Sequence, residues 1–226
     1  MSLNAIETNA ELGVSAYRFE HTGSRGSAAW YLLPVVDELK PVLSNDTRVL
    51  DVGCGNGYWA GYFADQGCTV VGIDPSTSGI QQARRAYPSV RFEEDVVTND
   101  LVERLNEAPF DLVFSSEVVE HLYSPHTWAK ACFAACRPGG VLLCTTPYHG
   151  YVKNLAIALT NKCDSHWQPL REGGHIKFWS PATLERLLTE SGFVNVQMKG
   201  AGRWPLLWRS MVLRAERPGA ADMARS

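Results

Sequence analysis

The sequence lacks the features that mark several large classes of protein. Its longest apolar runs, such as residues 155–159 and 141–144, fall far short of the roughly 20 residues that cross a bilayer. Lys and Arg total 21 against 24 Asp and Glu, so the basic excess typical of nucleic-acid binders is missing. With 45% hydrophobic and 20% charged residues, the chain is neither disordered nor fibrous. The 226 residues therefore predict one large domain, or one domain with an insertion.

The six cysteines form no C-x-x-C pair of the kind that indicates a zinc or redox site. They are spread through apolar segments, so we expect buried free thiols in a reducing compartment rather than disulfides. The opening residues, MSLNAIETNAEL, lack a basic flank and an apolar stretch, so no secretory signal is expected. Together these features favour a cytoplasmic protein.

From residue 47 onward, short β-rich apolar runs alternate with stretches that suit helices. This alternation predicts an α/β fold with a Rossmann-like, doubly wound, mostly parallel sheet. The expected strands are 47–52, 69–73, 90–93, 110–114, 141–145 and 193–198, and the expected helices are 28–39, 58–66, 76–86, 101–106, 126–136 and 182–190. The segment Arg137-Pro138-Gly139-Gly140 is expected to be a turn.

The chain divides into three expected parts: an N-terminal helical cover (1–44), the main domain (45–216) and a flexible tail (217–226). Within the main domain, residues 147–178, called the insertion below, interrupt the alternation. So long a connection is uncommon unless it is functional, for example as a lid or substrate cap. Its stretch 152–159 is apolar on one side, which fits either a lid helix or a weak contact with a membrane surface.

The most informative stretch is 49–57 (VLDVGCGNG), an apolar strand that runs into a glycine-rich turn. Glycines at 53, 55 and 57 let the backbone turn sharply and approach a ligand at the end of the strand. A dinucleotide site needs a third glycine in the pattern G-x-G-x-x-G, but that position is Tyr58. A nicotinamide-dependent oxidoreductase is therefore disfavoured.

The pattern D-x-G-x-G-x-G resembles motif I of the class I S-adenosylmethionine-dependent methyltransferases, and the resemblance continues in order along residues 45 to 200. It implies the class I methyltransferase fold, with S-adenosylmethionine as cofactor and S-adenosylhomocysteine as product. It also implies that Asp51, Gly53, Gly55 and Gly57 bind the cofactor.

Acidic residues follow the next two strands. Asp74, with Pro75 beside it, stands where a carboxylate can accept hydrogen bonds from both ribose hydroxyls of an adenosine; capping the next helix is the alternative. Asp95 matches the acid that family members place near the adenine amino group, with the backbone of Val96 beside it; a solvated turn acid is the alternative. Arg25 resembles an upstream arginine that reaches the carboxylate of the cofactor.

Polar groups crowd the end of the fourth strand, in residues 115–122 (SSEVVEHL). This segment is similar to the ubiquinone-biosynthesis O-methyltransferases, which methylate catechol-like hydroxyls. The resemblance implies that Ser116 contacts the cofactor and that Glu117, Glu120 and His121 bind a magnesium ion. These three share a face only if the segment is helical. Their ligand types also suit manganese, iron or zinc. The alternative is that the glutamates only stabilise a helix N-terminus and that His121 only hydrogen-bonds the lid.

Residues 173–178 (GGHIKF) resemble the glycine–histidine segment of the same subfamily, although the aspartate that follows the histidine there is missing. An imidazole, with a usual pKa of ~6.5, suits the removal of a hydroxyl proton near neutral pH. His175 and His121 are therefore the candidate catalytic residues. A histidine that only braces the loop is the alternative for His175.

The insertion does not match the quinone-pathway enzymes closely, and its aromatic residues fit a flat, aromatic or polyketide-like acceptor, although they are also ordinary core residues. We therefore predict O-methylation of a hydroxyl on a small metabolite, with no nucleic-acid partner and the oligomeric state open. N-methylation, C-methylation and a cofactor-binding partner protein without catalysis are the alternatives.

Overall fold

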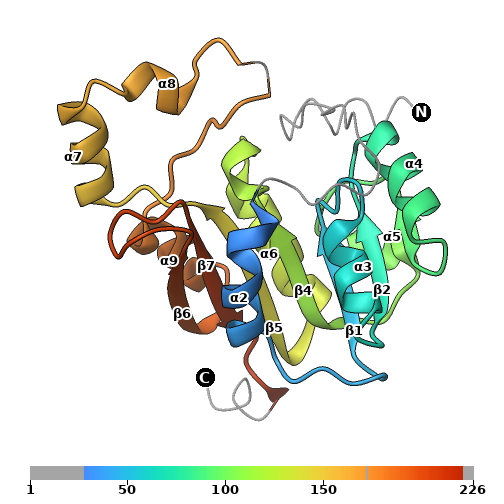
Figure 1. The fold of residues 1–226 in the computed structure, drawn as a ribbon. Helices are drawn as coiled ribbons and strands as arrows, with labels where there is room; N and C mark the ends of the chain where they lie inside the picture. The colour runs from blue at the N-terminus through green and yellow to red at the C-terminus, as the bar shows by residue number, and fades with distance from the viewer. Residues whose placement is uncertain (1–27, 172, 221–226) are drawn as a thin grey trace.

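The computed structural model describes residues 28–171 and 173–220, which form a seven-stranded sheet between two layers of helices (Figure 1). Arg25 lies outside the described residues. The strand order is β3-β2-β1-β4-β5-β7-β6, and β7 runs in the direction opposite to the other six strands. The strands are β1 (Arg48–Val52), β2 (Thr69–Ile73), β3 (Arg91–Glu93), β4 (Phe110–Ser116), β5 (Cys136–Pro147), β6 (Val194–Ala201) and β7 (Ser210–Glu216). The expected doubly wound, mostly parallel sheet is confirmed.

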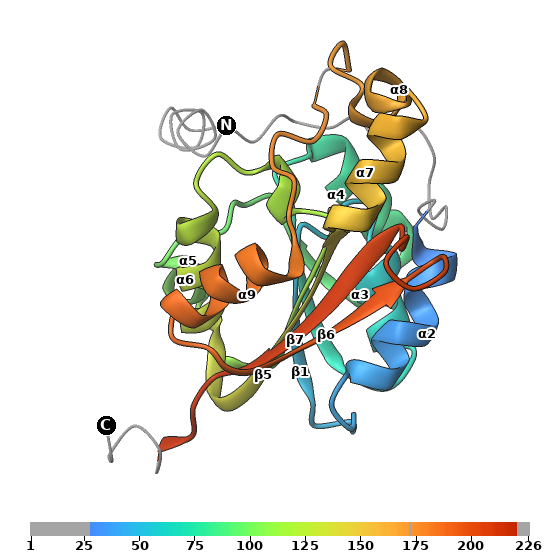
Figure 2. The ribbon, with the colours of Figure 1, turned by 90° about the vertical axis from the view of Figure 1, so that its left-hand side faces the viewer.

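Helices cover both faces of the sheet and divide the core in two (Figure 2). One core lies under α2 (Ala29–Leu39), α3 (Tyr58–Ala64) and α4 (Thr77–Ala86). The other lies under α5 (Leu101–Leu105), α6 (Pro125–Ala135) and α9 (Pro181–Glu190). Phe63 and Phe114 are fully buried in the first core, and Trp128 and Phe193 in the second. Since both faces of the central strands are buried, most of their residues are apolar and do not alternate with polar ones.

The order of the strands fixes where a ligand can bind. β1 pairs in parallel with β2 on one side and with β4 on the other, so the direction of winding reverses between β1 and β4. In open α/β sheets the crevice at the carboxyl ends of the strands at such a switch point is the usual ligand site. The glycine-rich turn follows β1 directly, and the polar segment 115–122 begins within β4, so both lie at this edge.

Two local expectations need correction. Residues 137–140 do not end the ladder: Cys136 opposes Phe110 and Val141 opposes Leu112, so these four residues bulge out within a longer β5. Arg217, expected to be the first residue of a loose tail, is held to the domain, because its guanidinium donates to the carbonyls of residues 133, 134 and 136 at the end of α6. One guanidinium nitrogen thus satisfies three carbonyls at the end of a helix, where they have no partner within the helix. A sequence pattern does not reveal such a contact.

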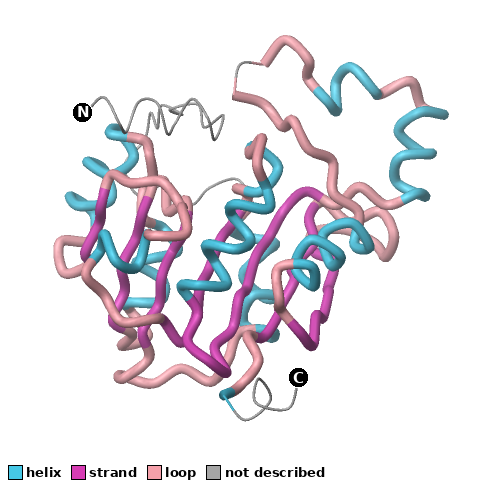
Figure 3. The backbone as a smooth tube through the Cα atoms, turned by 180° about the vertical axis from the view of Figure 1, so that it is seen from behind, coloured by secondary structure: helices cyan, strands magenta, loops and turns pink. Residues whose placement is uncertain are grey.

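The insertion leaves the sheet at the carboxyl end of β5 and stands away from the body of the domain (Figure 3). It carries α7 (Tyr151–Leu159), near the expected helix, and the short α8 (Cys163–Trp167), which sequence analysis did not predict. The insertion then returns to the sheet edge before α9. In the part of the chain that the structure describes, no helix is long and apolar enough to span a membrane.

Candidate active site

The glycine-rich turn is shaped by packing as well as by its conformation. Gly53 and Gly57 have φ values of 76° and 84°, in the region that favours glycine. A Cβ on Gly53 would lie 2.3 Å from Cγ2 of Val118, and one on Gly57 would lie 2.8 Å from Cβ of Ala83 in α4. The turn therefore needs glycine at both positions, which brings α4 and the segment after β4 close to the end of β1.

Asp74 joins the end of β2 to this turn. Its Oδ2 accepts the backbone N–H of Gly55 at 2.9 Å, and its Oδ1 accepts that of Ser76 at 2.8 Å. Burial raises the pKa of Asp74 to about 6. The N-cap of α4 is Ser76, whose hydroxyl accepts the N–H of Gly79, so Asp74 is not itself the cap. Each carboxylate oxygen keeps a further lone pair for a ligand hydroxyl.

Asp51, within β1, is a buried acid with an unsatisfied atom. Its exposure is 1%, and Oδ2 has no hydrogen-bond partner among the described residues. Burial, and then the charge of Asp74, raise the pKa of Asp51 to about 8. Because an unpartnered buried carboxyl oxygen is costly, such groups are concentrated at functional sites. Asp51 therefore suits a ligand that brings an ammonium or another donor.

An apolar cavity opens beside the turn, with about 420 Å³ of empty space when the solvent at its mouth is included. Asp95, on its wall, is not a free turn acid: its Oδ1 accepts the backbone N–H of Val96 at 2.8 Å and the guanidinium of Arg104 at 2.9 Å. The cavity exposes almost only apolar surface, with Asp95 and Val96 among the residues that line it, which suits a flat heterocycle. Its lining residues are Val52, Gly53, Ile73, Pro75, Asp95, Val96, Val97, Val118, Leu122, Ser124 and Trp128.

Glu117 leaves the end of β4 in an unusual conformation, with φ at 55°. Its backbone N–H donates to the carbonyl of Thr145 at 3.0 Å, and the Thr145 hydroxyl donates to Oε1 of Glu117 at 3.0 Å. Ser116 bonds to the same hydroxyl at 3.0 Å. Ser210, which bonds to Tyr31 at 3.1 Å, also supports the Glu117 carboxylate. Burial raises the pKa of Glu117 to about 7.

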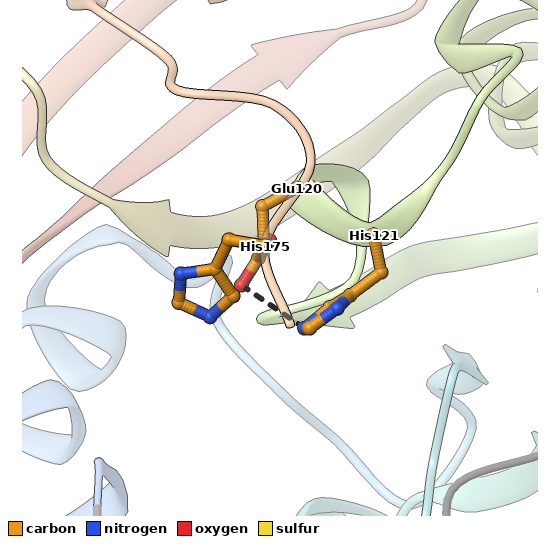
Figure 4. Close-up of side chains that lie close together, drawn as sticks. All are labelled: Glu120, His121 and His175. Carbon is orange, nitrogen blue, oxygen red and sulfur yellow. Dashed lines mark ion pairs between the residues drawn. The ribbon is translucent and has the colours of Figure 1, made fainter. Parts of the chain in front are cut away.

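The segment that follows is not the α-helix that a shared face would require. Val119–His121 form a single 3₁₀ turn, η1, and Glu117 points toward β5. Instead, Glu120 and His121 meet His175 from the insertion, with their potential ligand atoms all within 4.8 Å of one another (Figure 4). The structure thus brings His175, and not Glu117, together with Glu120 and His121.

Backbone hydrogen bonds bring His175 to this cluster. The N–H groups of the two residues after it both donate to the carbonyl of Glu120, at 2.9 and 3.0 Å. Nδ1 of His121 bonds to the carbonyl of Gly174 at 3.2 Å, and since a carbonyl only accepts, Nδ1 carries the proton and Nε2 offers a lone pair. Burial lowers the pKa of His121, and burial followed by the nearby His121 lowers that of His175 to about 4. Both imidazoles are therefore neutral at pH 7.

Glu120 is fully buried, and only one of its carboxyl oxygens is satisfied. Oε2 accepts the hydroxyl of Thr146 at 2.9 Å, whereas Oε1 has no hydrogen-bond partner in the described residues and lies 3.9 Å from Nε2 of His121. Burial, and then the charge of Glu117, raise the pKa of Glu120 well above its ordinary value. Two neutral imidazoles and an unsatisfied carboxyl oxygen form a donor set that fits a borderline divalent cation.

Sequence analysis missed several polar residues of this edge, among them Thr145, Thr146, Ser210 and Lys153. For the two threonines a signal existed, because they lie at the carboxyl end of a long apolar strand, and Asp74 likewise lies just after the carboxyl end of β2. Ser210 and Lys153 had none, since β7 and α7 reach the site only through the tertiary fold.

Solved structures place this arrangement in a fold class. The chain matches 1,6-didemethyltoxoflavin-N1-methyltransferase of Burkholderia thailandensis with a TM-score of 0.59 at 19% identity, over 82% of this chain and 77% of that one. An S-adenosylmethionine-dependent methyltransferase of Archaeoglobus fulgidus matches with a TM-score of 0.59 at 16% identity, over 82% and 91%. At such identities the likeness concerns the fold, which is that of the class I methyltransferases.

Sequence comparison then identifies the family. A family model described as a methyltransferase domain matches residues 28–198, so the chain belongs to this family. The ubiquinone biosynthesis O-methyltransferase of Dinoroseobacter shibae is 34% identical over 156 residues, which are 68% of this chain and 62% of that protein. The enzyme of the same name from Agrobacterium fabrum is 31% identical over 186 residues, 77% and 74% respectively. The chain spans about three fifths of the length of the first curated relatives that it matches.

Proposed function

We propose that the chain is an S-adenosylmethionine-dependent methyltransferase that methylates a hydroxyl group of a small molecule. One observation carries the proposal: Gly53, Pro75 and Asp95 line one cavity from three neighbouring strand ends, and Asp74, beside Pro75, bonds to the glycine turn. Membership of the methyltransferase domain family supports the reaction type. The names of the curated relatives support oxygen as the methylated atom, in preference to nitrogen or carbon.

The residues at this edge fit the cofactor group by group. Asp74 has lone pairs left for the two ribose hydroxyls, and Pro75, Asp95 and Val96 line the apolar cavity that would take the adenine. The unsatisfied Oδ2 of Asp51 would accept the ammonium of the methionine part. When bound, S-adenosylmethionine would supply the methyl group of its sulfonium. The methyl group would pass to the acceptor oxygen by in-line displacement, with S-adenosylhomocysteine as the leaving group. The protein has to align the acceptor oxygen with that methyl and exclude water.

The acceptor hydroxyl has to lose its proton, and His121 and His175 are the groups that suit this step. Both are neutral at pH 7, and the bond from Nδ1 to Gly174 leaves Nε2 of His121 free to accept a proton. Glu117 lies one strand end away, bonded to Thr145. We therefore assign proton removal to the histidine pair. Glu117 would help to hold the acceptor in place.

A divalent cation at Glu120, His121 and His175 is a separable part of the proposal. The unsatisfied Oε1 of Glu120 and the free Nε2 of His121 support it. Two imidazoles and one carboxylate suit zinc, manganese or iron better than magnesium, which prefers oxygen ligands. Such a cation would lower the pKa of a coordinated hydroxyl and orient it.

The surroundings of the site suit an apolar acceptor. Large side chains are exposed on the insertion and on the loop between β6 and β7, namely Tyr151, Leu159, Trp167, Leu170 and Trp204. They support an aromatic or polyketide-like acceptor, or a weak contact of the insertion with a membrane surface. The six free cysteines support a reducing compartment such as the cytoplasm.

Calorimetric titration of S-adenosylhomocysteine into EDTA-treated protein tests the cofactor, with NADH as the control ligand. We expect micromolar binding of the former and none of NADH. Repeating the titration with zinc, manganese or magnesium, and assaying methyl transfer to a panel of catechols, amines and carbon acids, tests the cation and the acceptor atom. Failure to bind S-adenosylhomocysteine would overturn the proposal, and transfer only to amines would overturn its O-methylation part.

A further inference from the structure

Lys153, in the first turn of α7, is a buried lysine that lacks a carboxylate partner. It is 7% exposed, and its Nζ donates to the carbonyls of Tyr148 at 2.7 Å and Arg209 at 3.3 Å. It forms no ion pair with an acid among the residues that the structure describes. Two carbonyls can orient an ammonium, but they do not neutralise it. The positive charge of Lys153 is therefore buried at a cost in free energy.

The groups that the structure describes around Lys153 are basic except for one acid, Glu117, which forms no ion pair with it. Burial, and then the nearby Arg203, lower the pKa of Lys153 to about 8, although Glu117 acts in the opposite direction. Burial and then Lys153 lower the pKa of His149 to about 4, and burial, Lys153 and Arg203 lower that of His166. In the cluster of His149, Lys153, His166 and Arg203, called the basic cluster below, the imidazoles are therefore neutral at pH 7 and the positive charge belongs to Lys153 and Arg203.

The basic cluster packs against two neighbouring aromatic residues, Phe178 and Trp167, called the aromatic wall below, and Lys153 lies near enough to Glu117 to feel its charge. The ring of His149 lies 4.9 Å from that of Phe178 and 5.4 Å from that of His166, centroid to centroid. Nδ1 of His149 bonds to the amide oxygen of Asn154 at 3.3 Å, which leaves its Nε2 available. Lys153 lies at the ends of β5 and β7, next to the strand end where Glu117 bonds to Thr145.

We propose that the methyl acceptor carries a carboxylate or phosphate group and that Lys153, assisted by Arg203, binds it. The inference rests on the proposed methyltransferase function and adds the substrate class. An anion here would satisfy the ammonium of Lys153, and the exposed guanidinium of Arg203 can form charged hydrogen bonds to its rim. The aromatic wall would hold the ring or chain that carries this acidic group.

Binding of small probes tests the proposal directly. Benzoate, phenyl phosphate and the neutral benzamide are titrated calorimetrically into the full chain saturated with S-adenosylhomocysteine. We expect at least one of the two anions to bind about tenfold or more tightly than benzamide, and the tighter one identifies the acidic group. Lys153→Met should abolish this preference. Lys162→Met, which changes an exposed lysine between α7 and α8, is the matched control and should retain it.

Three results would contradict anion binding by Lys153. Equal binding of the three probes, no binding of either anion, or a preference that survives Lys153→Met would overturn the proposal. Titration of every variant with S-adenosylhomocysteine reports whether its fold is intact, and a wild-type chain that binds no cofactor contradicts the proposed function instead. Should Lys153→Met fail to fold, the exposed Arg203→Gln decides: weakened anion binding supports the proposal, and unchanged binding overturns it.

Discussion

The carboxylate of Asp74 accepts the backbone N–H of Gly55 at 2.9 Å, so the acid after β2 and the glycine turn after β1 form one unit. Its other oxygen holds the N–H of Ser76 at the start of α4. The ligand-binding edge is thus fixed by a single buried side chain that bonds to two loops at once. A change at Asp74 should therefore affect both cofactor binding and the shape of the turn.

Asp74→Asn should weaken the affinity for S-adenosylhomocysteine by about tenfold to a hundredfold. An amide nitrogen cannot accept the Gly55 N–H, and a neutral group makes weaker hydrogen bonds to the ribose than a carboxylate does. Calorimetric titration measures the loss. Asp65→Asn, an exposed acid at the end of α3, is the control and should bind as the wild type does. Wild-type affinity in Asp74→Asn would show that the ribose lies elsewhere.

Cofactor affinity should also depend on pH through Asp74. Burial raises the pKa of this group to about 6, and ribose hydroxyls bind best to the ionised form. The dissociation constant for S-adenosylhomocysteine should therefore rise as the pH falls below 6, by at most about tenfold per pH unit for one proton. Titrations from pH 4.5 to 7.5 measure this dependence. In Asp74→Asn the step at pH 6 should vanish, and a step that persists there belongs to another group.

Much of the fold follows from local sequence signals, because its elements are marked at both ends. β2 has the bounds that its apolar run predicts, and α9 begins at Pro181 after the Ser180 cap and ends before Gly192. α8 was not predicted because none of its side chains is buried, so no amphipathic pattern records it.

The cofactor edge could be predicted because its residues come directly after strands, in chain order. The cluster of Glu120, His121 and His175 could not, for two physical reasons. The positive φ of Glu117 depends on hydrogen bonds to Thr145, which belongs to another strand. His175 reaches the cluster through backbone bonds to Glu120 across a long separation in sequence. Neither contact produces a periodic pattern of residues in the sequence.

Asp51→Asn should stabilise the ligand-free protein at alkaline pH while it weakens cofactor binding. The folded pKa of Asp51, about 8, lies above its ordinary value of 3.8, so the stability linked to its proton is fully present below about pH 4 and is lost as the pH rises toward 8. The free energy of unfolding of the wild type should therefore fall relative to the variant across this range, by at most about 1.4 kcal/mol per pH unit. Urea unfolding at pH 5 and pH 8 measures the difference, and equal differences at both values would contradict the assignment.

Thr145→Val should lower turnover more than it lowers cofactor affinity. The hydroxyl of this buried residue donates to Glu117 and bonds to Ser116, so its loss removes a hydrogen bond that holds the Glu117 carboxylate against β5. We expect a loss of roughly tenfold in kcat and a cost in stability of about 1–2 kcal/mol. Thr145→Ser keeps the hydroxyl and should restore turnover. If the serine variant is as slow as the valine variant, Thr145 acts through packing alone.

Affinity for a cation distinguishes the two possible ligand sets of this site. The structure groups Glu120 and His121 with His175, whereas resemblance to the quinone-pathway enzymes implies Glu117 as the third ligand. Competition with a chromophoric zinc chelator measures affinity without any need for an acceptor. Glu120→Gln and His175→Gln should each weaken binding by at least tenfold, because each removes one of three ligands. Glu117→Gln, the matched control, should change it little, since the carboxylate of Glu117 is held by Thr145. The reverse ranking would restore the set implied by the resemblance, and a wild-type chain that binds no zinc, manganese or iron would leave His121 and His175 as proton acceptors alone.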